Sequence, residues 1–555
     1  MEGRPEVPDP QVAELADEVL ERACAADPRL ATTLGDHRFD GELPDPSASA
    51  RDRRIAELEA LRQRALALPE NATGAADLVD LEVLAGALSE QLVYLRDVRE
   101  PDWNPMEHNP GSALELLLTR EFAPLPERLE SVAQRLFRLG DYFAAARERL
   151  SSMPAVFVET AELQLRGLRT MCTDRIPAAA AGTAVADAVT GACAAAVPAV
   201  DRHLNWLAGA ATDSLPERRL GVELFASKLR WTLGTELAPD ELLAHALTDL
   251  DRATDAITEA AARWGGSSGS GASVRDVLDA LARDVVDDRT ILGYCRDALV
   301  EATAFVAEQD LVTLPDEPIG VIELPEVDRG VAVAYCRAPG PLEAAGLPTE
   351  FAVSPTPEDW TAERVASFYR EYNVHMLHDL TVHEAMPGHA VQVIAANHGG
   401  SPVTRTWRNG AFVEGWAVYA EELMAGRGYR SGASGRDGLG LLMQQLKMRL
   451  RTVINTVLDI RYHCDGLTQG EAMQLMTERG FQEEGEAAGK WRRVQLSSTQ
   501  LCEYFTGYLE VRALAADLRA IRPEAADRAL HDEMLAHGAP PVPQLRRLVG
   551  LAPRG

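Results

Sequence analysis

The stretch Thr381-Val-His-Glu-Ala-Met-Pro-Gly-His389 ends a segment with the pattern of a long helix and places two imidazoles and a carboxylate close together. His383 and His389 are six residues apart, which on an unbroken helix corresponds to about 600° of rotation and separates their side chains. Pro387 and Gly388 lie between them. Because proline disfavours helix in the residue before it and glycine accepts positive φ, we expect a bulge that brings the imidazoles together.

This spacing predicts a metal site. In the H-E-x-x-H pattern of zinc hydrolases, two histidines four residues apart bind the metal and the glutamate acts as general base. Glu384 follows His383 in the same way. We therefore predict that His383 and His389 bind zinc. Glu384 is predicted to take the proton from a metal-activated water and to deliver it to the leaving group.

A catalytic zinc ion usually has three protein ligands and one open position. Glu414 is the leading candidate for the third ligand, because it lies among apolar residues and precedes Gly415, which would let two helices approach closely. Glu421 is seven residues further and lies on the same helix face. It is the alternative ligand, or a residue that supports one.

Other candidates follow later in the chain. A second donor to a developing oxyanion is needed, and His463 and Tyr504 are candidates that compete with a purely structural role. Arg449, Arg451 and Arg461 stand out in a chain of net charge −30. They are candidates for binding a substrate carboxylate, and ion pairing on a helix surface is the alternative.

Composition limits the possible classes of protein. The 555 residues are 46% hydrophobic and 25% charged, as in ordinary soluble globular proteins. The net charge of −30 argues against nucleic acid as a partner. No apolar run is long enough to span a membrane, and no signal peptide is visible. The seven cysteines are scattered and form no C-x-x-C pair, so we expect reduced thiols in a cytoplasmic protein.

Helical spacing recurs through most of the chain. The pattern changes between Ile319 and Ser354, where residues 321–324, 331–335 and 350–353 form short β-type runs. The glycine- and serine-rich segment 265–271 is interpreted as a surface loop. We predict a mainly α fold: one domain over residues 1–555, with a helical part at 1–314, and a small antiparallel sheet and the catalytic helices at 315–555.

The helices around the motif have clear start and stop signals. Thr356-Pro-Glu-Asp359 has the residues of a helix start, and this helix is expected to reach Met386 with a break near Asn373. A second helix is predicted over residues 411–424 and a third over residues 439–463.

Two motifs together resemble a known family. His-Glu-Ala-Met-Pro-Gly-His, followed by Gln392, and Phe412-Val-Glu-Gly-Trp-Ala-Val-Tyr-Ala-Glu421 are similar to motifs of the domain of unknown function 885 family, bacterial proteins grouped with zinc metallopeptidases. The resemblance covers essentially the whole chain, including the segments around His463 and Tyr504.

The family is similar to the gluzincins. This similarity implies a mostly helical fold, one zinc ion per chain, His383, His389 and Glu414 as ligands, and Glu384 as the base.

The chain departs from the family's later motifs at Asn455, Arg461 and Phe505, where members tend to have Arg, Gly and Lys. We expect these positions to shape the substrate pocket. The combined prediction is a zinc-dependent hydrolase that cleaves a small peptide or peptide-like amide. The alternatives are an iron enzyme that uses two histidines and one carboxylate on a small metabolite, and a binding protein with a relic site. The oligomeric state, and whether cleavage is internal or terminal, are left open.

Overall fold

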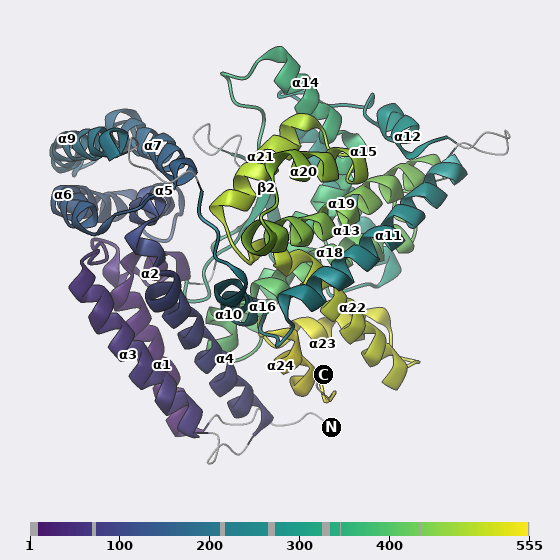
Figure 1. Cartoon of the computed structure of the whole chain (residues 1–555), viewed down its shortest axis with the longest axis horizontal. Coiled ribbons are helices and arrows are strands. Elements are labelled where there is room, and N and C mark those ends of the chain that lie inside the picture. Colours follow the sequence, from purple (N-terminus) through teal and green to yellow (C-terminus); the bar gives the residue numbers. More distant parts are fainter. Residues whose placement is uncertain are drawn as a thin grey trace. The chain divides into compact units, whose positions relative to one another are not determined.

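The computed structural model describes residues 9–68, 74–210, 217–264, 272–324, 333–344, 346–432, 435–552 and 554. Most of these residues are helical, and the described part contains three short strands (Figure 1). The prediction of a mainly α fold with a small sheet is therefore confirmed. The glycine-rich segment 265–271 lies outside the described residues.

The chain divides into two compact units, Met1–Arg218 with Pro339–Leu347, and Arg219–Ala338 with Pro348–Gly555. The division falls at Arg218 rather than at residue 314. Compactness alone does not test whether either unit folds by itself. The assignment of one domain to residues 1–555 therefore stays a prediction.

The first unit is helical. Its α-helices are α1 (Pro10–Ala26), α2 (Pro28–Leu34), α3 (Ala48–Ala67), α4 (Ala75–Leu92), α5 (Gly111–Thr119), α6 (Leu125–Arg149), α7 (Ala155–Thr170), α8 (Ile176–Ala180) and α9 (Ala186–Ala210). The first half of α9 is rich in alanine, and Ala192, Ala196 and Ala199 are buried. Small side chains let α9 pack closely against its neighbours, α6 and α7.

The second unit holds the sheet and the motif helices. Its helices are α10 (Val222–Leu233), α11 (Pro239–Trp264), α12 (Val274–Leu281), α13 (Ile291–Gln309), α14 (Ala362–Glu371), α15 (Val374–Glu384), α16 (His389–His398), α17 (Pro402–Thr406), α18 (Gly410–Gly426), α19 (Arg436–Ile460), α20 (Gln469–Gln474), α21 (Glu484–Leu496), α22 (Glu503–Ile521), α23 (Asp527–Leu535) and α24 (Val542–Leu548). No helix in the described ranges combines the length and the apolar character that crossing a bilayer requires.

The sheet consists of β1 (Ile319–Glu323), β2 (Ala334–Arg337) and β3 (Thr349–Val353), in the order β1-β3-β2. β2 pairs with β3 antiparallel, whereas β1 pairs with β3 parallel. The prediction of a wholly antiparallel sheet is therefore wrong. The long connection between β1 and β3 supplies the crossover that a parallel pair needs, and the residue pattern of a strand does not specify its direction.

The helix predicted to start at Thr356 begins later. The backbone N–H and the hydroxyl of Thr356 both donate to Asp288, and α14 starts behind Thr361, whose side chain accepts from Arg364 N–H. The break near Asn373 is confirmed. The side chain of Asn373 caps α15, which carries the motif.

Candidate metal centre

The Pro-Gly turn joins α15 to α16. Gly388 N–H donates to Val382 O at 3.0 Å, so the turn folds back onto the end of α15. A Cβ atom at Gly388 would lie 1.9 Å from His383 O, and only glycine fits there. Trp416 Nε1–H donates to Pro387 O at 2.9 Å and holds the turn against α18. The backbone of the turn is therefore fixed from both sides.

The turn brings three side chains from three helices together. His383 is the second-last residue of α15, His389 begins α16 and Glu414 lies in the first half of α18. Glu414 Oε2 is 3.6 Å from His383 Nε2 and 3.5 Å from His389 Nε2. The three potential ligand atoms lie within 4.8 Å of one another. The expected bulge thus places both imidazoles beside one carboxylate.

These side chains fit a zinc ion. Ligand atoms about 2.0–2.2 Å from a tetrahedral zinc ion lie about 3.3–3.6 Å from each other, as Glu414 Oε2 lies from both imidazoles. Such separations are too long for N–H···O hydrogen bonds. Glu414 Oε2 is also buried without a hydrogen-bond partner. A cation shared by His383, His389 and Glu414 would satisfy that oxygen.

Glu421 orients the first imidazole. Its side chain is 1% exposed, and its Oε1 lies 2.6 Å from His383 Nδ1. We assign the proton to Nδ1, which leaves His383 Nε2 free to face Glu414. Burial opposes a charge on His383, but Glu414 and Glu421 raise its pKa well above the usual value. The same negative charges would favour a bound cation. In this geometry Glu421 supports a ligand rather than acting as the third ligand.

Glu384 lies beside the cluster but outside it. Its Oε2 accepts a hydrogen bond from the backbone N–H of Cys336 in β2 at 2.9 Å. Burial raises the pKa of Glu384, the charge of Glu414 raises it further, and His383 and His389 oppose both. A buried carboxylate with a raised pKa next to a candidate metal centre is suited to accepting a proton.

Close packing of α18 on α22 positions Glu414. A Cβ atom at Gly415 would lie 2.2 Å from the carbonyl carbon of Gly507, and one at Gly507 would lie 1.7 Å from Ala411 O. Both glycines are therefore required for the backbones to approach. The sequence predicted this role for Gly415, and the structure confirms the close approach.

His463 is engaged by the backbone on both sides. Leu220 N–H donates to its Nδ1 at 3.4 Å, and its Nε2–H donates to Ser497 O at 2.9 Å. Asp459 is further from Nε2, at 3.7 Å. Burial lowers the pKa of His463 to about 4, so the ring is neutral and the longer contact is no ion pair. These contacts give His463 a structural role, and its catalytic role stays a prediction.

Tyr504 is electrostatically linked to Glu414 of the candidate metal centre. Its hydroxyl accepts hydrogen bonds from Arg493 Nη2 at 3.0 Å and Gln500 Nε2 at 3.4 Å. Burial raises the pKa of Tyr504, and the charge of Glu414 raises it further. The hydroxyl thus stays protonated near the cluster, and its role as a donor to substrate stays a prediction.

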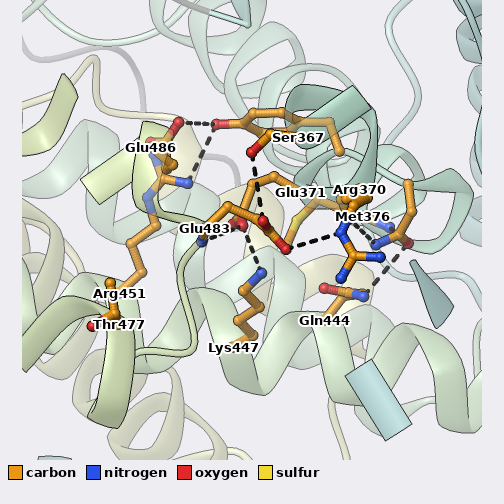
Figure 2. A network of polar contacts seen from close by, with 12 residues as sticks. Ser367, Arg370, Glu371, Met376, Gln444, Lys447, Arg451, Thr477, Glu483 and Glu486 are labelled. Atoms are coloured by element: carbon orange, nitrogen blue, oxygen red, sulfur yellow. Dashed lines mark hydrogen bonds and ion pairs between the residues drawn. The ribbon is translucent and has the colours of Figure 1, made fainter. Parts of the chain in front are cut away.

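Each of the three predicted substrate-binding arginines has a carboxylate partner within the protein: Arg449 pairs with Asp249, Arg451 with Glu486, and Arg461 with Glu471. Figure 2 shows the pair formed by Arg451. The guanidinium of Arg449 also lies 3.4 Å from the centre of the Tyr508 ring. The alternative of ion pairing accounts for all three positions, and substrate binding by them stays a prediction.

Lys490 on α21 was not singled out from the sequence. It is buried, and burial lowers its pKa well below the usual value, aided by Arg451 and Arg493 and opposed by Glu486 and Glu414. The helical spacing offered a signal. Lys490 lies three residues after buried Ala487 and four before buried Val494, on the apolar face of its helix.

A family model described as "Bacterial protein of unknown function (DUF885)" matches residues 28–549. The chain belongs to the DUF885 family. The family resemblance seen in the sequence is thereby confirmed, whereas no comparison supports the kinship to gluzincins. No curated protein matches this DUF885 chain.

Two solved structures are similar to this DUF885 protein over almost their whole length. One, described as a putative lipoprotein of unknown function from Shewanella oneidensis, has 27% sequence identity and a TM-score of 0.81, with 97% of this chain and 99% of that chain covered. The other, a putative lipoprotein from Colwellia psychrerythraea, has 18% identity and a TM-score of 0.80, with 97% and 98% covered. The second supports the fold alone.

The prediction of a cytoplasmic location is wrong. The similar structure from Shewanella oneidensis is described as a putative lipoprotein, and this finding contradicts the cytoplasmic assignment. The location was inferred from the number and spacing of the cysteines, which do not indicate whether the thiols are accessible. Five of the seven free thiols are buried, and burial raises the pKa of several of them, including that of Cys172 to about 12. A buried, protonated thiol is unreactive in either kind of compartment.

Proposed function

We propose that this DUF885 protein is a zinc-dependent hydrolase that cleaves a small peptide or a peptide-like amide. The observation that carries the proposal is the position of Glu384. This buried carboxylate interacts electrostatically with His383, His389 and Glu414 without being one of the three candidate ligands, and it accepts a hydrogen bond from Cys336 N–H. A bound zinc ion supplies Lewis acidity, which lowers the pKa of water towards about 7 and polarises a carbonyl group.

Each residue of the site would have its own role. His383, His389 and Glu414 would hold the ion, and Glu421 would keep His383 in the tautomer with Nε2 free. Glu384 would take a proton at its carboxylate and return it to the leaving nitrogen. Its raised pKa favours the uptake, because a carboxylate of higher pKa is a stronger base, and the leaving amine, which is more basic still, would take the proton back.

Glu384 also favours hydrolysis over the iron alternative. Two histidines and one carboxylate can hold iron as well as zinc. Activation of oxygen at iron has no need for an additional buried carboxylate that accepts a proton, whereas hydrolysis does. Metal analysis of protein purified without added metal separates the two, since iron in place of zinc would contradict the proposal.

The variant Glu384→Gln tests the mechanism. We expect it to keep one zinc ion per chain. Its rate of hydrolysis, measured on a library of short peptides with free and blocked ends, should be at least about 100-fold below that of wild type. Glu363→Gln, at an exposed position of α14, is the matched control and should behave as wild type. Full activity of Glu384→Gln would refute the assigned base, and zinc-loaded wild type that cleaves no peptide would favour a relic binding protein.

The place of action follows from the Shewanella oneidensis relative. Its description as a putative lipoprotein supports activity outside the cytoplasm. Small peptides from the surroundings are then the expected substrates, and the net charge of −30 disfavours nucleic acid.

A further inference from the structure

Lys490 on α21 is a buried cation without a partner. It is 5% exposed, its Nζ atom is not wholly enclosed, and within the described part of the chain it makes no hydrogen bond or ion pair. Lys228 and Lys447, the other lysines of the chain, donate to Ser498 and Glu371. Burial without an anion lowers the pKa of Lys490, and a bound anion would stabilise its charged form. The position therefore favours a ligand that brings a negative charge.

The acidic residue closest to Lys490 along its helix already has other partners. Glu486 lies four residues earlier on α21, a spacing at which opposite charges can pair. One oxygen of Glu486 instead pairs with Arg451 (Figure 2), and the other accepts from the hydroxyl of Tyr372 at 3.2 Å. The ammonium of Lys490 is thus left for a ligand.

Arg493 adds a second cation one turn further along α21. Its Nη2 donates to Gln500 Oε1 at 2.8 Å and to the hydroxyl of Tyr504 at 3.0 Å. Among the residues that the structure describes, no carboxylate pairs with it. These two bonds orient the guanidinium and use only one of its nitrogens, so other N–H groups remain for an anion. Residues three apart are neighbours on a helix surface, so Arg493 and Lys490 can share one ligand.

Tyr504 connects the two cations with the metal centre. It lies one turn before Gly507, where α22 touches α18 next to Glu414. The charge of Glu414 acts on both Tyr504 and Lys490. An anion bound by the two cations would therefore lie beside the metal centre.

We propose that Lys490 and Arg493 form a subsite that binds the terminal carboxylate of a peptide substrate. The two oxygens of a carboxylate can accept from an ammonium and a guanidinium group at once. One residue of an extended peptide spans only about 3.3–3.6 Å, so a carboxylate held beside the metal centre brings the last peptide bonds of the substrate to the metal. The protein would then remove residues from the carboxyl end. This removal rests on the proposed hydrolysis, whereas binding of the carboxylate does not.

Binding to the zinc-loaded full chain with Glu384→Gln tests the subsite without cleavage. Calorimetric titration compares acetyl-trialanine with its carboxyl-terminal amide, and with an amide of the same length that ends in glutamate. Lys490→Met and Arg493→Gln each remove one cation from this background, and Lys490→Gln serves if Lys490→Met fails to fold. Lys228→Met is the matched control, because it removes a lysine that already has a partner.

We expect acetyl-trialanine to bind at least about tenfold more tightly than its amide. Lys490→Met should abolish this preference and leave the affinity for the amide unchanged, which a purely structural role of Lys490 would not produce. Arg493→Gln should reduce the preference, and Lys228→Met should keep it. Equal affinity for acid and amide, or a preference kept in both Lys490 variants, would overturn the proposal. Tighter binding of the amide that ends in glutamate would overturn it in favour of a side-chain carboxylate.

Hydrolysis by the wild type separates failure of the subsite from failure of the proposed function. Equal cleavage of acetyl-trialanine and its amide would overturn the subsite and leave the hydrolase in place. Cleavage of neither, together with binding that requires the carboxylate and Lys490, would refute hydrolysis and support the subsite in a binding protein.

Discussion

The support that Glu421 gives to His383 leads to a quantitative prediction about metal affinity. Glu421 Oε1 is 2.6 Å from His383 Nδ1, and the carboxylate is almost fully buried. Burial raises the pKa of both Glu421 and neighbouring Asp379. The charge of Glu421 raises the pKa of Asp379 further, whereas the hydrogen bond to His383 lowers that of Glu421, so we place the negative charge of the pair on Glu421. Glu421→Gln removes that charge and keeps an oxygen that can accept from Nδ1.

The expected loss follows from the type of hydrogen bond. A hydrogen bond to a charged group contributes about 1.5–3 kcal/mol, and one between neutral groups contributes about 0.5–1.5 kcal/mol. Loss of the charge at Glu421 should therefore cost about 1–1.5 kcal/mol, which is about a tenfold weaker affinity for zinc. Glu421→Ala also leaves Nδ1–H of His383 without its partner. We expect this variant to bind zinc about 100-fold more weakly.

Competition for zinc against a chelator of known affinity measures both losses. Circular dichroism of each variant checks that the helices remain. Glu422→Gln is the matched control, because Glu422 is the next residue of α18 and bonds Tyr508 instead of a metal ligand. Wild-type affinity in Glu421→Ala, or an equal loss in Glu422→Gln, would refute the assigned role of Glu421.

Two further predictions concern stability. Gly415→Ala puts a Cβ atom 2.2 Å from a backbone carbon of α22 and should lower the free energy of unfolding by at least about 1–3 kcal/mol. Gly426→Ala in the same helix meets nothing within 4 Å and should be neutral or slightly stabilising, and thermal melting compares the two variants. Burial opposes protonation of His37, but hydrogen bonds with Asp40 and Glu343 raise its pKa to about 9. This contribution is fully present below the unfolded pKa of about 6.5 and is lost as the pH rises through about 9. The melting temperature of wild type should therefore exceed that of His37→Gln at pH 6 and approach it above pH 9; a gap independent of pH would contradict the assignment.

Local signals were sufficient for much of the metal centre. A Pro-Gly pair does not continue a regular helix, so its position between His383 and His389 predicted a bulge from the sequence alone. Gly415 likewise indicated a close approach of helices beside Glu414. Both inferences rest on backbone geometry that residue type controls directly.

Long-range contacts account for what the sequence did not reveal. Thr356 has the residues of a helix cap around it, but Asp288, far earlier in the chain, takes both its N–H and its hydroxyl. The direction of β1 depends on where the chain re-enters the sheet, and no strand pattern encodes that. The cavity lined by Asn373 and Gln444 brings together residues more than 70 positions apart, and neither residue is distinctive in its own segment.

The balance of charge explains why the centre calls for a cation. Buried Glu384 and Glu421 and partly buried Glu414 lie around the two imidazoles of His383 and His389. Burying carboxylates is costly unless positive charge or hydrogen bonds offset them, and Glu414 Oε2 has no hydrogen bond. Protonated imidazoles would compensate part of this charge, but they would place two cations side by side. A single divalent ion between Nε2 of both rings and Glu414 Oε2 compensates the carboxylates and lets the rings stay neutral.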